Sequence, residues 1–137
     1  MSLNFRLRLY LIVLVAVLFF CIAHTMFGAE KDILHRHDVA EGIQQIKHDA
    51  FGPLHIETLL EIYPGGIVFV GGTGLDVQPP PAAPGLLATV HCHPDEEYPK
   101  PSPKDIASAV ALQVPVYVIS HHAVWVVMPD GNAKEIK

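Results

Sequence analysis

The chain has 137 residues, enough for one small domain, and half of them are hydrophobic. Two of its nine basic residues, Arg6 and Arg8, precede residue 30, so residues 30–137 carry seven bases against 14 acids and a net charge near −7. This negative charge argues against nucleic-acid binding, which requires a basic surface. Only Cys21 and Cys92 are present, so a domain that lacks the N-terminal segment has no internal disulfide bond.

The N-terminal segment has the pattern of an export signal. Arg6 and Arg8 precede an apolar run of 15 residues, Leu9 to Ala23. That run is shorter than the roughly 20 residues that span a bilayer, although its extension to residue 27 would make a signal anchor. We therefore expect residues 1–29 to be a signal peptide, or a signal anchor that tethers the protein through residues 9–27. In either case the protein is exported, to the periplasm or the extracellular space, or held at the inner membrane.

A tether and a helix are predicted next. Residues 30–37 are charged and are assigned to the tether. Asp38 can cap a helix that reaches about Phe51, where Gly52-Pro53 ends it. The helical spacing of four apolar residues predicts its buried stripe. These residues are Val39, Ile43, Ile46 and Ala50.

Strands are predicted after this helix. Residues 55–63 and 67–70 are strand-like and flank Pro64-Gly65-Gly66, which predicts a hairpin. The segment 71–85 is rich in glycine and proline and is expected to be an extended surface loop. A further apolar and partly β-branched run, residues 86–93, predicts a buried strand.

The C-terminal third completes the predicted domain. Ser102 can cap a helix from Pro103 to about Leu112, since proline is favoured in the first turn. Residues 117–119 and 124–128 are then expected to pair as strands. The predicted fold class is α+β, with a mixed sheet flanked by two helices in a single domain over residues 38–137.

A cluster of metal-binding residue types follows the buried strand. Side chains alternate along a strand, so His91 and His93 point to one face and Cys92 to the other. Two imidazoles and the carboxylate of Asp105 make a three-ligand set that leaves a fourth position of a zinc ion open. An open position is typical of catalytic zinc, which acidifies a bound water. The opposite orientation of Cys92 predicts a small core residue and disfavours a cysteine nucleophile.

These residues resemble the zinc motif of the JAB/MPN (JAMM) metallopeptidase superfamily, which has an upstream glutamate, His-x-His and Ser-x-x-Asp. The chain has His91-x-His93 and Ser102-x-x-Asp105, and Glu57 is the best upstream glutamate. The match is nearer still to the JAB-like domain of bacterial secreted proteins and toxins. It covers roughly residues 38–137, with its specificity in residues 88–105. Eleven residues separate His93 from Asp105, one more than is usual in the superfamily.

The resemblance implies a JAB/MPN-like domain of the cytidine-deaminase-like fold and a role for each matching residue. His91, His93 and Asp105 would hold Zn(II), Glu57 would be the general base, and Ser102 would help to polarise the substrate carbonyl. Ser102 and Asp105 also have a simpler interpretation, as the cap and a first-turn acid of a helix. Glu61 has the same strand parity as Glu57 and is its rival, and Glu41 on the first helix is a further candidate.

The resemblance further implies a zinc-dependent hydrolase of amide bonds, with a peptide or protein as substrate and a metal-activated water as nucleophile. The alternative is a non-catalytic JAB-like scaffold of an exported envelope protein or effector. Two observations distinguish the hydrolase from the scaffold: whether the domain holds zinc, and whether Glu57 lies within reach of that zinc.

Overall fold

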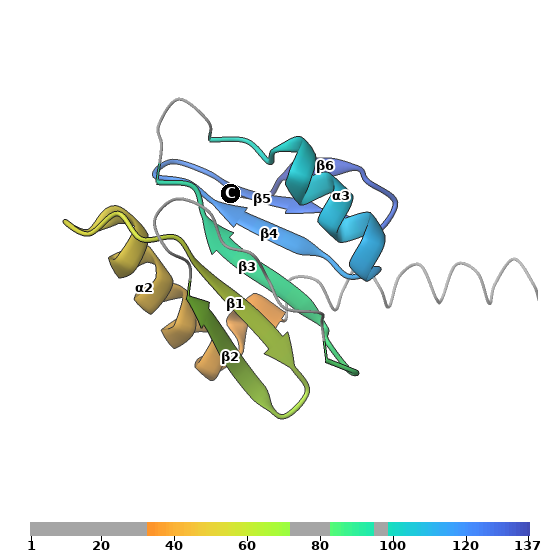
Figure 1. The fold of residues 1–137 in the computed structure, drawn as a ribbon, viewed down its shortest axis with the longest axis horizontal. Coiled ribbons are helices and arrows are strands. Elements are labelled where there is room, and N and C mark those ends of the chain that lie inside the picture. Colours follow the sequence, from red (N-terminus) through yellow and green to blue (C-terminus); the bar gives the residue numbers. More distant parts are fainter. Residues whose placement is uncertain (1–32, 72–82, 95–98) are drawn as a thin grey trace, which may run out of the picture. The chain divides into compact units, whose positions relative to one another are not determined.

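A computed structural model describes residues 33–71, 83–94 and 99–137 (Figure 1). The chain divides into two compact units, Met1–Arg36 and His37–Lys137. The expected leader over residues 1–29, its membrane tether at 9–27 and most of the loop at 71–85 lie outside the described residues. Among the residues that are described, no helix combines the length and the apolar character needed to cross a membrane.

The unit from His37 to Lys137 has an α+β fold in which two helices flank a six-stranded mixed sheet (Figure 1). Its elements are α2 (His37–Phe51), β1 (Thr58–Tyr63), β2 (Gly66–Gly71), β3 (Ala88–Cys92), α3 (Pro103–Leu112), β4 (Val116–Ile119), β5 (Val124–Val127) and β6 (Ala133–Glu135). The strand order is β2-β1-β3-β4-β5-β6, and only the β3–β4 pair among these is parallel. The predicted α+β class, mixed sheet and two flanking helices are confirmed.

Helix α2 covers the face of the sheet to which the Leu60 side chain points. Its buried residues are Val39, Gly42, Ile46 and Ala50, so Gly42 joins the predicted stripe and Ile43 lies at its border. A Cβ atom on Gly42 would come within 2.8 Å of Ile67 and 3.1 Å of Leu60, so glycine permits this close approach. Asp38 lies inside the first turn instead of capping it, and its charge there suits the helix dipole.

The β1–β2 hairpin forms as predicted, but β1 is shorter than expected. Tyr63 pairs with Gly66, so Pro64 and Gly65 make a two-residue connection. The strand begins at Thr58, and His55, which was predicted to lie in it, has a positive φ of 47° that is incompatible with an extended strand. Glu57 therefore lies immediately before β1, not within it.

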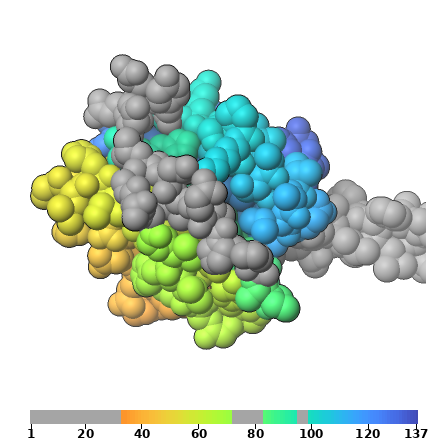
Figure 2. All heavy atoms as spheres, viewed as in Figure 1, coloured from red at the N-terminus to blue at the C-terminus, as the bar shows by residue number. Residues whose placement is uncertain are grey.

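Helix α3 covers the opposite face. Its residue Ala109 packs against Val116, Val118 and Val127, whose side chains point to the same face of β4 and β5. The space-filling view from the same side shows α3, in cyan to blue, forming the surface over these strands (Figure 2). Because β3 and β4 are parallel, α3 is the crossover that connects them. The predicted β4–β5 pair is confirmed, whereas β6 had not been predicted.

Candidate metal centre

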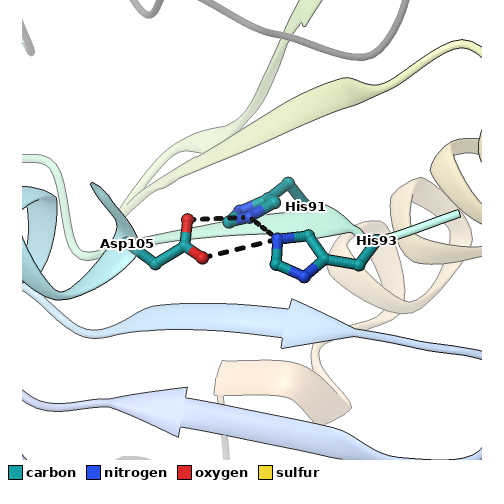
Figure 3. A group of neighbouring side chains, drawn as sticks. All are labelled: His91, His93 and Asp105. Atoms are coloured by element: carbon teal, nitrogen blue, oxygen red, sulfur yellow. Dashed lines mark hydrogen bonds and ion pairs between the residues drawn. The ribbon is translucent and has the colours of Figure 1, made fainter. Parts of the chain in front are cut away.

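His91 and His93 project from the end of β3 on the α3 face of the sheet (Figure 3). His91 lies in β3, and the backbone N–H of His93 donates to Ile119 O at 2.8 Å, so the strand ladder continues one residue beyond β3. Strand alternation is thereby kept, and the two Nε2 atoms lie 3.2 Å apart. The side chains are only 7% and 15% exposed.

Asp105 reaches the histidines from the first turn of α3. Ser102 has an extended backbone, and its Oγ accepts a hydrogen bond from the N–H of Asp105 at 3.2 Å. In return, Asp105 Oδ2 accepts from the Ser102 N–H at 2.6 Å and from the Ser102 hydroxyl at 2.8 Å. This capping box fixes the start of the helix and the direction of the carboxylate together. The predicted cap and helix are confirmed.

The three side chains converge on one point. Asp105 Oδ1 lies 3.0 Å from His91 Nε2, and Oδ2 lies 3.4 Å from His93 Nε2 (Figure 3). One donor atom from each residue falls within 4.8 Å of the others, so the group could hold a metal ion. A tetrahedral ion with bonds of about 2.0–2.1 Å places its ligands about 3.3–3.4 Å apart, which is close to the 3.2 Å between the two Nε2 atoms.

The electrostatics of the group favour an ionised carboxylate. Burial alone would raise the pKa of Asp105, but hydrogen bonds from His91 and His93 and the charge of His91 outweigh burial and hold the pKa far below its ordinary value. The backbone N–H of Ser102 acts in the same direction. A deprotonated carboxylate is the form that binds a metal ion.

Of the three candidate glutamates, Glu57 is the one beside the histidines. Its Oε1 lies 3.9 Å from His91 Nε2, and the side chain is 15% exposed. Glu61 accepts a hydrogen bond from the Tyr63 hydroxyl at 2.8 Å, and Glu41 is an exposed partner of His37 on α2. Strand parity could not separate Glu57 from Glu61, but the antiparallel β1–β3 register places Glu57 at the His93 end.

Two further residues are neighbours of the histidines in the sheet, one along β3 and one on the adjacent strand β1. Cys92 is completely buried on the other face, and burial raises the pKa of its thiol to about 12, consistent with the predicted core residue. Leu59 was not singled out from the sequence. The β1–β3 register places it opposite His91 on the same face, where it is 7% exposed. The alternation of β1 would have been the signal for this apolar neighbour.

Fold and site together define an α+β domain with a largely buried His-His-Asp group at the carboxyl end of β3. No protein-family model, curated protein or solved structure matches the chain. The chemistry of the group must therefore be inferred from the arrangement of its own side chains.

Proposed function

We propose that the chain is a JAB/MPN-like zinc hydrolase that cleaves an amide bond, of the peptide or isopeptide class. The observation that carries the proposal is the convergence of His91, His93 and Asp105, with the Glu57 carboxylate 3.9 Å from His91. These four residues, together with Ser102, are the ones that match the zinc motif of that superfamily. The order of α3, β4 and β5 after the motif is further support.

Zinc is the proposed ion, and the same donor set also suits other first-row metal ions. Two neutral imidazoles and one carboxylate are borderline and hard ligands of the kind that catalytic zinc sites use. Three protein ligands leave one position for water or substrate. Bound there, zinc would lower the pKa of a coordinated water to near neutrality and polarise the amide carbonyl.

Glu57 is proposed as the general base and acid. Its carboxylate lies on the same side of the sheet as the ligand nitrogens and is largely shielded from solvent. A carboxylate at this point can take the proton of the attacking water at Oε1 and deliver it to the leaving amine nitrogen. The strand and helix candidates Glu61 and Glu41 are held by other partners.

Ser102 is proposed as a positioning residue. The resemblance implies a hydroxyl that polarises the substrate carbonyl, but the Ser102 hydroxyl donates its hydrogen to Asp105 Oδ2. A hydroxyl has one hydrogen to donate, so in this conformation it serves the ligand and not the substrate. Its contribution to activity would then pass through the orientation of Asp105.

The first test is the metal content of the purified full-length chain beside His91→Ala and Asp105→Ala. We expect about one zinc per chain in the wild type and none in either variant. His122→Ala is the matched control, because His122 is an exposed histidine outside the group. Zinc that survives both ligand substitutions, or a wild-type chain that takes up none, would refute the proposed site.

The second test is hydrolysis of amide substrates by the zinc-loaded chain. Glu57→Gln should abolish turnover while zinc stays bound, and Glu61→Gln should retain both because its amide oxygen still accepts from Tyr63. A chain that binds zinc but cleaves no amide, or a Glu57→Gln chain with full activity, contradicts the proposal. The first of these results would favour the non-catalytic scaffold.

A further inference from the structure

The sheet has two edge strands, β2 and β6, which differ in length and charge (Figure 1). Strand β6 is three residues long and carries Lys134 and Glu135, and short, charged edges discourage pairing with another strand. Strand β2 is six residues long, with the sequence Gly-Ile-Val-Phe-Val-Gly, and it has no charged residue. Of the two edges, only β2 has the composition of a strand that pairs further.

Two large apolar side chains of β2 are half exposed. Val68 is 48% exposed and Phe69 is 47% exposed. Phe69 is paired with Leu60 and points to the α2 face, whereas Val68 is paired with Glu61 and points to the α3 face. The residues of β2, in green, lie at the surface in the space-filling view (Figure 2). An apolar edge strand that is exposed on both faces is a template for pairing, and natural proteins cover such edges.

The direction of the free backbone groups of β2 follows from the pairing of β1. The carbonyl oxygen of Ile62 accepts from the N–H of Leu87 at 2.8 Å, so the polar groups of Ile62 point to the β3 side. These groups alternate along an antiparallel pair, so Ile67, which lies opposite Ile62, directs its own N–H and C=O outward. Phe69 and Gly71 have the same parity. These outward groups have no hydrogen-bond partner among the described residues.

The outward residues make β2 complementary to a second copy of itself. Antiparallel pairing about Phe69 places this residue opposite Phe69 of the other copy, Ile67 opposite Gly71, and Val68 opposite Val70. All three outward residues then form hydrogen-bonded pairs, whereas pairing about Val68 would use only Ile67 and Phe69. Each opposed pair is uncharged, and the central aromatic pair adds a favourable cross-strand contact.

The charge of the chain also favours this edge for self-association. Residues 30–137 carry a net charge near −7, so two copies repel one another over much of their surface. Pairing of two uncharged β2 strands sets no like charges opposite each other. A two-fold interface uses the β2 edge of both copies, and the short charged β6 edge opposes further growth. Assembly would therefore end at two copies.

We propose that the chain forms a dimer in which two β2 strands pair antiparallel and join the two six-stranded sheets into one. The two-fold axis is perpendicular to the sheet, so both His-His-Asp groups lie on the same face. Five strand spacings, about 24 Å, separate one β3 strand from the other. The dimer presents two candidate metal centres side by side, and its formation does not depend on the proposed hydrolase.

The test is hydrogen exchange of the metal-free full-length chain at increasing protein concentration, beside sedimentation velocity at the same concentrations. We expect a dimer, with exchange of the β2 amides of Ile67, Phe69 and Gly71 that slows as the dimer fills. Phe69→Lys and Phe69→Glu should each lose the dimer and the protection, because each sets like charges opposite one another. An equal mixture of the two variants should regain both.

The matched controls are Val110→Lys and Val110→Glu, which place the same charges on α3 at a site that is 44% exposed. Both should remain dimers. The mixture shows that the Phe69 variants are folded, since a misfolded strand could not regain the interface. A mixture that stays monomeric would overturn the proposal.

The other occupants of this edge give different results. A wild-type chain that stays monomeric with unprotected β2 amides would leave the edge to another polypeptide and overturn the proposal. Protection of β2 that does not change with concentration would assign the edge to a segment of the same chain. A dimer with unprotected β2 amides, or one that survives both Phe69 substitutions, would place the interface elsewhere. Each of these last results overturns the proposal as well.

Discussion

Replacement of Ser102 by alanine removes two bonds and leaves a third. The Oγ no longer accepts from the Asp105 N–H or donates to Asp105 Oδ2, whereas the backbone N–H of Ser102 still reaches that oxygen at 2.6 Å. Loss of a helix cap costs about 1 kcal/mol, and loss of a hydrogen bond to a charged group costs about 1.5–3 kcal/mol. Since the backbone bond remains, we expect Ser102→Ala to lower the free energy of unfolding by about 1–3 kcal/mol.

The same substitution should weaken zinc binding without abolishing it. Loss of a group that orients a metal ligand typically costs about 10–100-fold in affinity. Chemical denaturation of the metal-free chain measures the stability term, and competition with a chelator measures the zinc affinity. Ser102→Thr keeps the hydroxyl and should restore both, while Ser108→Ala in the middle of α3 should change neither by much. If Ser102→Ala left both quantities at their wild-type values, the inferred link between cap and ligand would be wrong.

Three further predictions concern Asp105, Cys92 and the core. The depressed pKa of Asp105 stabilises the metal-free fold above the unfolded pKa of about 3.9. The stability gap to Asp105→Asn, measured by denaturation, should therefore be full above about pH 5 and shrink below pH 4. The raised pKa of Cys92 should keep it unreactive toward a thiol reagent in a folded Cys21→Ser chain at pH 8, and stability should fall as the pH rises above about 8.5 toward 12. Leu60→Ala, at a fully buried site, should cost about 2–5 kcal/mol of unfolding free energy. Leu54→Ala, 76% exposed, should stay within about 0.5 kcal/mol.

The elements with strong local signals could be predicted from the sequence. The Ser102-Pro103 start of α3, the Pro64-Gly65 turn and the shared face of His91 and His93 each follow from a short-range rule. The His-His-Asp group could be predicted for the same reason, because a strand and a capped helix turn fix its parts. Its convergence within 4.8 Å agrees with that prediction.

Other features depend on contacts between distant segments. Strand β6 (Ala133–Glu135) has neither an apolar run nor β-branched residues, and it is a strand because it pairs with β5. The choice between Glu57 and Glu61 depended on the register between β1 and β3, which strand parity alone does not determine. A cavity of about 280 Å³ is lined by Lys100, Trp125 and Glu135 from three separate segments, so spacing along the chain gave no signal for it.

The proposed ligands lie close together along the chain, and this affects how metal binding and folding are coupled. His91 and Asp105 are separated by only 13 residues, a short loop with a small entropic cost of closure. An unfolded chain can therefore capture zinc with some affinity, which reduces the stabilisation that zinc gives to the native state. Glu57 joins the ligands only when β1 pairs with β3. A synthetic peptide of residues 88–106 would then be a zinc chelator without the base, and zinc uptake by a damaged or nascent chain would precede its capacity for chemistry.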